Sequence, residues 1–142
     1  MTALTKKRIL LADPDMPFRV ALARTLKFKG YSVDQAASVQ QMLHLLSKVP
    51  VSLVVIDIRM PETDGISLIR QLRQKFPDTH IIILSAGANV ETTIEAVKLG
   101  VKDYLLKPIA TGDILTAIDM VLHTRSNFAR QPVASQSHLR AS

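Results

Sequence analysis

The feature that most constrains this chain is a short apolar run, residues 51–56, that ends in a carboxylate, Asp57. A run this short and this rich in β-branched residues, with Pro50 before it and a Pro/Gly turn after it, is typical of a strand buried on both faces. A lone carboxylate is costly to bury, so we expect Asp57 to lie where the strand leaves the core. Ligands of open parallel sheets bind at the carboxyl ends of the strands, which places Asp57 for chemistry. The simpler interpretation is that Asp57 only caps the turn that follows.

Three other runs have the same form. Residues 7–13, 80–85 and 101–106 are short and mostly apolar, and their polar ends are Asp13, Ser85 and the adjoining Lys107. Residues 31–35 alternate between apolar and polar side chains, which predicts a more exposed strand. The chain therefore carries five predicted strands.

Amphipathic helices are predicted between these strands. The first covers residues 16–29, the second begins after Ser38 as its N-cap, the third begins after Asp64, the fourth ends at Gly100 and the fifth covers residues 111–123. The residues expected to face inward on the last three are Ile66, Ile69, Leu72 and Phe76, then a thin stripe of Val90, Thr93, Ile94 and Val97, then Ile114, Ile118, Val121 and Leu122.

Alternation of strands and helices predicts an α/β fold with a parallel sheet covered by helices. Right-handed crossovers favour a flavodoxin-like, doubly wound (βα)5 sheet with strand order 2-1-3-4-5. Its switch point lies between strands one and three, which end in Asp13 and Asp57.

The length of 142 residues and the hydrophobic content of 47% fit one domain, which we assign to residues 1–125. Residues 126–142 are polar and lack periodicity, so they are expected to be a disordered tail or the start of a linker. The chain has no cysteine, which excludes disulfides and thiolate metal sites. No signal peptide and no apolar run of membrane-spanning length is found, so we expect a cytoplasmic protein without membrane contact.

The formal charge of +6 raises the question of a nucleic-acid partner. The lysines and arginines are dispersed along the chain and aromatic residues make up only 4%. A binding face needs clustered cations, so direct nucleic-acid binding by this segment is not predicted.

Asp13, Asp57, Ser85 and Lys107 all follow strands of the predicted sheet, so we expect them to meet at one edge. Two carboxylates, one ammonium group and one hydroxyl suit phosphoryl chemistry. The carboxylates can hold Mg²⁺ and one of them can be the nucleophile, while the lysine neutralises the phosphoryl oxygens. Each residue alone has a simpler role in a turn or on the surface.

The motifs RILLADPD, VVIDIRMPETDG, IIILSAG and YLLKPI resemble those of the response-regulator receiver domains of two-component signalling, chemotaxis regulators among them. The resemblance covers about residues 7–124. It implies that Asp57 accepts a phosphoryl group from a sensor histidine kinase or a phosphotransfer protein, with Mg²⁺ bound by Asp13, Asp57 and the main-chain carbonyl of Arg59. It implies that Ser85 and Lys107 contact the phosphoryl group, that Tyr104 is the aromatic switch residue, and that the Lys107–Pro108 bond is cis.

The resemblance also implies what phosphorylation does. Ser85 moves toward the phosphoryl group, Tyr104 turns inward, and the surface formed by helix four, strand five and helix five changes. That surface would control a partner or an output domain, or form a homodimer. The chain would not be an enzyme beyond its own phosphorylation and dephosphorylation. A stand-alone receiver and a piece of a longer regulator both remain open.

One departure from the family is Pro14. The family has a second acid at this position, and proline has no side-chain oxygen. Either Asp15 reaches the metal, or Asp13 binds it alone, or the affinity for Mg²⁺ drops. We predict weaker Mg²⁺ binding than in a receiver with two adjacent acids. Arg59 is a second unusual feature, because its cation would either hinder an attacking water or simply be solvated.

Two other functions stay open at this point. A haloacid-dehalogenase-like phosphohydrolase would carry the phosphoryl group on Asp13, but this leaves the DIRMPETDG motif unexplained. A receiver-like interaction module would never be phosphorylated, because of Pro14.

Overall fold

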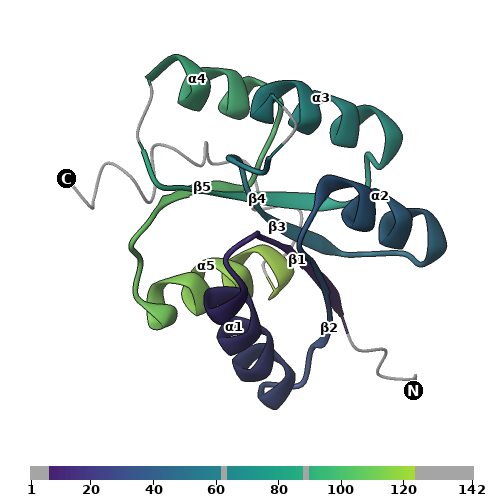
Figure 1. Ribbon diagram of the computed structural model, residues 1–142, viewed down its shortest axis with the longest axis vertical. Helices are drawn as coiled ribbons and strands as arrows, with labels where there is room; N and C mark the ends of the chain where they lie inside the picture. The colour runs from purple at the N-terminus through teal and green to yellow at the C-terminus, as the bar shows by residue number, and fades with distance from the viewer. Residues whose placement is uncertain (1–6, 62–63, 88–89, 124–142) are drawn as a thin grey trace.

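The computed structural model describes residues 7–61, 64–87 and 90–123, and within them the chain alternates strictly between strand and helix (Figure 1). The strands are β1 (Arg8–Ala12), β2 (Ser32–Ala36), β3 (Leu53–Asp57), β4 (His80–Ser85) and β5 (Asp103–Leu106). The helices are α1 (Met16–Phe28), α2 (Val39–Lys48), α3 (Gly65–Lys75), α4 (Val90–Lys98) and α5 (Thr111–His123). The predicted tail, residues 126–142, lies outside the described residues.

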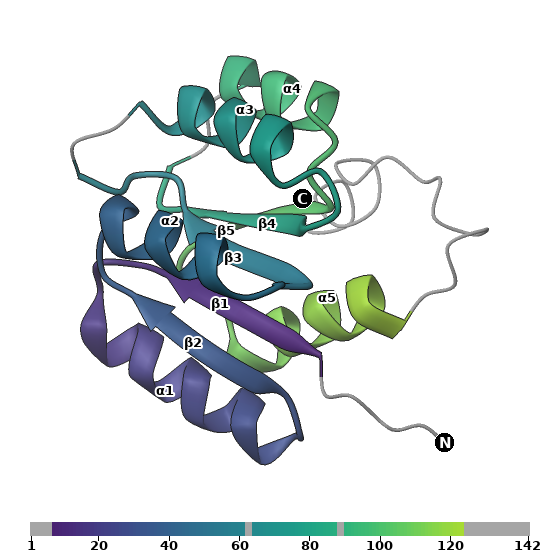
Figure 2. The same ribbon diagram turned by 90° about the vertical axis from the view of Figure 1, so that its right-hand side faces the viewer.

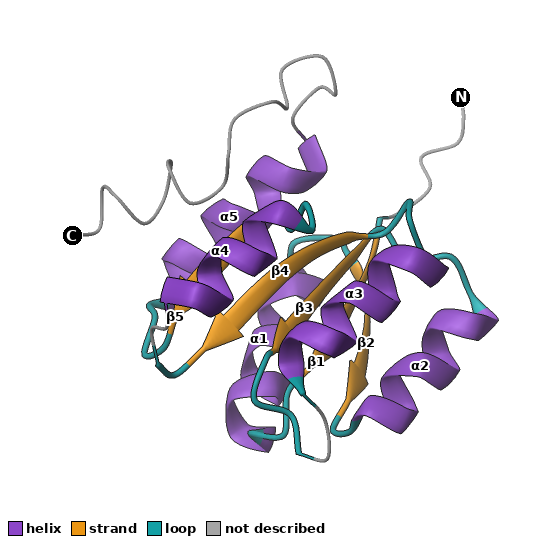
Figure 3. Cartoon of the chain, turned by 90° about the horizontal axis from the view of Figure 1, so that it is seen from above, coloured by secondary structure: helices purple, strands orange, loops and turns teal. Residues whose placement is uncertain are grey.

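The strands form one parallel sheet in the order β2-β1-β3-β4-β5, which confirms the predicted fold class. All five residues of β3 are buried, as expected for the central strand of a sheet covered on both faces. β2 lies at an edge, and three of its five residues are only partly buried. Figure 3 shows the strand arrows pointing toward the same edge of the sheet.

Helices cover both faces of the sheet. α1 and α5 lie side by side on one face, and α2, α3 and α4 cover the other (Figures 1 and 2). Because successive side chains of a strand point to opposite faces, each strand contributes to two cores. One contains Leu10, Val54 and Ile83, and the other contains Ile9, Val55 and Ile82.

Several predicted helix boundaries are confirmed. Ser38 is the N-cap of α2, and its side chain accepts a hydrogen bond from the backbone N–H of Gln41. Asp64 is at the N-cap position of α3, where its carboxylate accepts from the Ser67 hydroxyl at 2.7 Å. Gly100 follows α4 with φ +82°, a conformation that glycine adopts without steric cost.

The inward faces of α3 and α5 are largely as predicted. Leu68 joins Ile69 and Leu72 as a buried residue of α3, whereas Ile66 and Phe76 are partly buried. In α5, Ala117 joins the buried residues Ile114, Ile118 and Leu122.

The prediction for α4 is wrong in part. Val90 and Ile94 are 75% and 48% exposed, and the buried residue is Ala96, which the predicted stripe did not include. A stripe of only four weakly apolar residues does not determine which side of a helix faces the sheet. The small side chain of Ala96 allows close packing on the sheet. α4 is therefore attached by a narrow contact.

The described residues contain no helix that is both long enough and apolar enough to span a membrane.

Candidate functional site

The ends of β1 and β3 and the residue after β5 meet at one edge of the sheet. Ile56 pairs with Ala12 on one side and with Ile83 on the other, so the next residues, Asp13 and Asp57, emerge together. The backbone N–H of Lys107 donates to the Ser85 carbonyl at 2.7 Å, which brings the end of β4 to the same place. The structure thus places the four predicted residues at one edge of the sheet.

Lys107 joins the two carboxylates. Its Nζ atom donates to Asp13 Oδ2 and to Asp57 Oδ2, each at 2.8 Å. The side chains of Asp13 and Asp57 are only 3% and 9% exposed, and that of Lys107 is 17% exposed. Buried charges are tolerated when they are paired, so the three groups depend on one another. The Lys107–Pro108 bond is cis, as the resemblance implied.

The pKa of Lys107 reflects two opposing effects. Burial by itself lowers it, but the hydrogen bonds to Asp13 and Asp57 and the negative charge of both outweigh burial, so the pKa of Lys107 is raised. The ammonium form is therefore favoured, so that a cation lies between the two acids.

The second oxygen of each acid is held by the backbone. Asp13 Oδ1 accepts from the N–H of Asp15, and Asp57 Oδ1 accepts from the N–H of Arg59, both at 2.8 Å. Both carboxylates are thus fixed in orientation. The Arg59 side chain is exposed, which is consistent with the solvated alternative named for it.

Arg19 supports the end of β1 and was missed from the sequence. Its Nη1 atom donates to the carbonyl of Asp13 at 2.7 Å, and its Nε atom donates to Gln35 Oε1 at 3.0 Å. Arg19 lies on α1 and Gln35 lies on β2. The sequence pattern does not indicate that these two side chains meet.

Ser85 and Tyr104 lie at the neighbouring strands. The Ser85 hydroxyl donates to the carbonyl of Gly87 at 2.7 Å and accepts from its N–H at 3.2 Å. The Tyr104 side chain is buried, with the residue 1% exposed. Ser85, Tyr104 and Thr92 line an open pocket of about 320 Å³ between the loops that follow β3 and β4. The roles in a switch assigned to Ser85 and Tyr104 stay predictions.

Asp15 does something other than what the sequence suggested. Its side chain is the N-cap of α1, and Oδ1 accepts from the N–H of Phe18 at 3.2 Å. Within the described residues, no three His, Cys, Asp or Glu side chains gather closely enough to hold a metal ion. Metal binding by Asp15 therefore stays a prediction.

Many surface cations face acids. Arg8 pairs with Asp34 at 2.8 Å and Lys29 with Asp119 at 3.0 Å, and Arg70 lies 3.8 Å from Glu95. These pairs leave the net charge of +6 unchanged, and the absence of nucleic-acid binding by this segment stays a prediction.

A 2-1-3-4-5 sheet that presents two acids bridged by a lysine at its carboxyl edge defines the receiver class of signalling domains. The chain belongs to the response regulator receiver domain family, whose sequence profile matches residues 9–119.

Relatives and solved structures agree with this assignment. The acid tolerance regulatory protein ActR of Rhizobium meliloti is 37% identical over 112 residues, which is 79% of this chain and 58% of that protein. A CheY-like receiver domain from Methanospirillum hungatei superimposes with a TM-score of 0.77 at 27% identity, covering 81% of this chain and 92% of the other.

A third comparison concerns the chemistry. A response regulator from Burkholderia pseudomallei, solved with a phosphorylated aspartic acid, a calcium ion and citrate, superimposes with a TM-score of 0.76 at 30% identity. The superposition covers 96% of this chain and 74% of the other. The chain spans about half the length of the curated relatives it matches, for example 50% of the response regulator MprA of Mycolicibacterium vanbaalenii.

Proposed function

We propose that Asp57 accepts a phosphoryl group from the phosphohistidine of a sensor kinase or a phosphotransfer protein, and that the modified domain controls a partner or an output domain. The observation that carries the proposal is the bridge from Lys107 Nζ to both Asp13 and Asp57 at 2.8 Å. It places a fixed cation where the oxygens of a phosphoryl group on Asp57 would carry negative charge. The chain would work in the cytoplasm, where it meets the kinase.

The proposed reaction is a transfer between two side chains. A carboxylate oxygen of Asp57 forms a bond to phosphorus while the bond from phosphorus to the donor imidazole nitrogen breaks. The nitrogen keeps the electron pair and takes up a proton. Asp57 is held ready by the N–H of Arg59, and Lys107 stabilises the charge on the transferred group. The chain would convert no other substrate, so its chemistry is limited to gaining and losing this group.

The donor atoms at the site fit magnesium in kind. The carboxylates of Asp13 and Asp57 and the carbonyl of Arg59 are hard oxygen ligands. Pro14 adds none, and the carboxylate of Asp15 caps α1. When bound, Mg²⁺ would neutralise charge on the phosphoryl oxygens. We expect it to bind more weakly here than in a site with two adjacent acids.

The output would arise from the surface of α4, β5 and α5. Phosphorylation adds negative charge and acceptor oxygens near the hydroxyl of Ser85. If Ser85 turns from Gly87 toward the phosphoryl group, both hydrogen bonds between its hydroxyl and the Gly87 backbone are lost. α4 has a single fully buried residue, Ala96, so its packing is the easiest to change. Tyr104 is already buried in this structure, so the inward side chain would be retained and stabilised.

The test uses the full chain and acetyl phosphate with Mg²⁺. Intact-mass spectrometry should show one added phosphoryl group, lost in Asp57→Asn and retained in part in Asp13→Asn. A phosphoryl group that survives Asp57→Asn but not Asp13→Asn would support the hydrolase alternative. If the unchanged chain takes up no phosphoryl group, even from a kinase donor, the result would favour the alternative of an interaction module that is never phosphorylated. NMR spectra with beryllofluoride should then show changes along α4, β5 and α5.

A further inference from the structure

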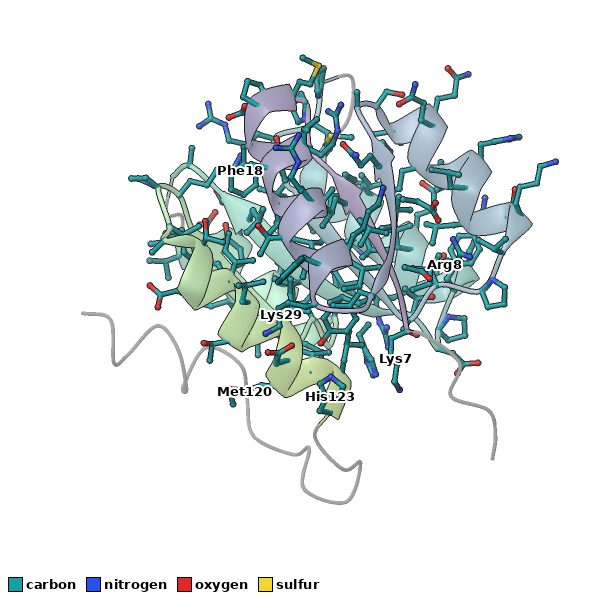
Figure 4. All side chains as sticks on the ribbon, turned by 90° about the horizontal axis from the view of Figure 1, so that it is seen from below. Lys7, Arg8, Phe18, Lys29, Met120 and His123 are labelled. Carbon is teal, nitrogen blue, oxygen red and sulfur yellow. The ribbon has the colours of Figure 1, made fainter. Side chains whose placement is uncertain are left out.

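The aromatic ring of Phe18 lies over the site lysine. Lys107 Nζ is 4.7 Å from the centroid of the Phe18 ring, within the range of a cation–π contact. Phe18 belongs to the first turn of α1, and 89 positions separate it from Lys107 in the sequence. Figure 4 shows Phe18 at the end of α1 opposite to Lys29.

Phe18 is part of a closed circuit of contacts. Asp13 Oδ1 accepts from the N–H of Asp15 at 2.8 Å, and Asp15 Oδ1 accepts from the N–H of Phe18 at 3.2 Å. The Phe18 ring contacts Lys107 Nζ. The same Nζ atom donates a hydrogen bond to Asp13 Oδ2 at 2.8 Å, which closes the circuit. The acid that could have replaced the missing metal ligand, Asp15, thus fixes the residue that carries the ring.

Two prolines stiffen this segment. Pro14 lies between Asp13 and Asp15, and Pro17 stands in the first turn of α1, where its fixed φ suits the helix and its missing N–H costs nothing. The fixed φ of both prolines restricts the backbone of residues 13–18, which limits where the Phe18 ring can lie.

We propose that Phe18 is a positioning residue that keeps Lys107 in its bridging pose at the phosphorylation site. A lysine side chain is long and has many rotamers, so holding it over two acids is entropically costly. The ring offers the ammonium group a third neighbour and covers part of its surface from water. Lys107 is then already in place when a phosphoryl group forms on Asp57. The kinetic part of this inference rests on the proposed function, whereas the geometric part does not.

The competing explanation is that Phe18 only fills space, since it packs against the core on the α1 and α5 face. Phe18→Leu keeps an apolar side chain and removes the ring, while Phe18→Tyr keeps the ring. Phe28→Leu is the matched control, because Phe28 is at the end of the same helix and is 92% exposed.

The first measurement is independent of phosphorylation. In NMR spectra of the full chain, the Phe18 ring should shift the resonances of the Lys107 methylene groups next to Nζ. That shift should be lost in Phe18→Leu, and the Lys107 ammonium group should become more mobile. Both properties should be kept in Phe18→Tyr and in Phe28→Leu. Unchanged Lys107 resonances in Phe18→Leu would overturn the proposal, whatever the protein does with phosphodonors.

The second measurement is the rate of phosphorylation by acetyl phosphate. We expect Phe18→Leu to slow it about two- to tenfold, the range that corresponds to one cation–π contact, and Phe18→Tyr to restore it. Urea denaturation of each variant shows that the fold is intact. Equal slowing in Phe18→Leu and Phe18→Tyr would indicate a packing role only. A chain that takes up no phosphoryl group, but in which Phe18→Leu frees Lys107, would contradict the proposed function and leave the positioning role standing.

Discussion

The ammonium nitrogen of Lys107 lies 2.8 Å from the Oδ2 atom of Asp57, although the two residues are 50 positions apart in the sequence. The same nitrogen is as close to Asp13 Oδ2. The site therefore holds three largely buried charged groups, the ammonium group of Lys107 and the carboxylates of Asp13 and Asp57. The stability of this arrangement depends on the lysine, because without it two carboxylates would face each other away from water.

Lys107→Met should consequently destabilise the unphosphorylated protein. Methionine matches the length of the stem but leaves both carboxylates without their cation. We expect the free energy of unfolding to fall by about 2–3 kcal/mol, somewhat less than the cost of breaking a fully buried pair, because the lysine is partly exposed. Urea denaturation at neutral pH measures it, and Lys98→Met, on the exposed side of α4, should change little.

A double variant separates charge repulsion from lost packing. Adding Asp13→Asn to Lys107→Met removes one of the two facing charges, so it should recover part of the lost stability. If the double variant is less stable than Lys107→Met alone, the cost does not come from the two carboxylates.

Pro14 is the position at which Mg²⁺ affinity should be adjustable. Pro14→Asp adds a third carboxylate beside Asp13 and Asp57, and calcium and magnesium sites gain affinity with the number of charged oxygen ligands. We expect the dissociation constant for Mg²⁺ to fall about tenfold, which corresponds to roughly 1.4 kcal/mol. The shift of the Ile58 amide resonance during a Mg²⁺ titration would report it.

Pro14→Ala is the control for this change, because it removes the proline without adding a ligand. It should leave Mg²⁺ affinity near that of the unchanged chain. Equal gains in Pro14→Ala and Pro14→Asp would point to backbone freedom as the cause, and no gain in either would refute the weak-site hypothesis.

The sequence was sufficient for those features that local pattern determines. The bounds of β4 and α5 were predicted correctly, because an apolar run or a helical period with polar boundaries defines each. The convergence of Asp13, Asp57 and Lys107 followed from the topology, since parallel strands bring their carboxyl ends to one edge.

The remaining features depend on contacts between distant segments. The ring of Phe18 over Lys107 and the bond from Arg19 to Gln35 join elements whose separation in the sequence gives no hint of contact. The role of Asp15 is different, because an acid placed just before a helix with Pro17 in its first turn is a recognisable N-cap signal. The same carboxylate lies close to Asp13 in the sequence, so the pattern fits a metal ligand as well as a helix cap.

A second polar cluster lies at the opposite end of α1 and α5. The Tyr31 hydroxyl donates to Asp119 Oδ1 and lies 3.0 Å from His123 Nε2, while Lys29 Nζ donates to Asp119 Oδ2 at 3.0 Å. Figure 4 shows Lys29 and His123 near each other at this end. Burial, the hydrogen bond to Asp119 and the charge of Asp119 raise the pKa of Tyr31.

Tyr31→Phe should therefore alter stability in a pH-dependent way. A raised pKa gives a contribution that is complete below the unfolded value of about 10 and is lost as the pH rises above it. At neutral pH we expect Tyr31→Phe to cost about 1 kcal/mol, the contribution of one hydrogen bond. From pH 10 upward the difference between the two proteins should shrink. Urea denaturation from pH 7 to 11 measures it, and a difference that stays constant over this range would contradict the assignment.

Gly65 should be the glycine least tolerant of a side chain, because α3 begins there against the loop that follows β3. A Cβ atom at this position would overlap the Cγ1 atom of Ile58 and would lie 2.5 Å from the Ile58 carbonyl oxygen, and a backbone atom cannot yield as a flexible side chain can. We expect Gly65→Ala to cost about 2 kcal/mol in unfolding free energy, a typical value for overpacking.

Gly112→Ala is the matched change, since Gly112 also stands in the first turn of a helix but has no atom within 4 Å of an added Cβ. Alanine at this position should be neutral or should stabilise the protein by up to about 1 kcal/mol. Because Ile58 directly follows Asp57, displacement of the loop in Gly65→Ala should also slow phosphorylation, whereas Gly112→Ala should not. Equal stability of the two variants would show that the start of α3 can shift without cost, and would contradict the close contact on which this prediction depends.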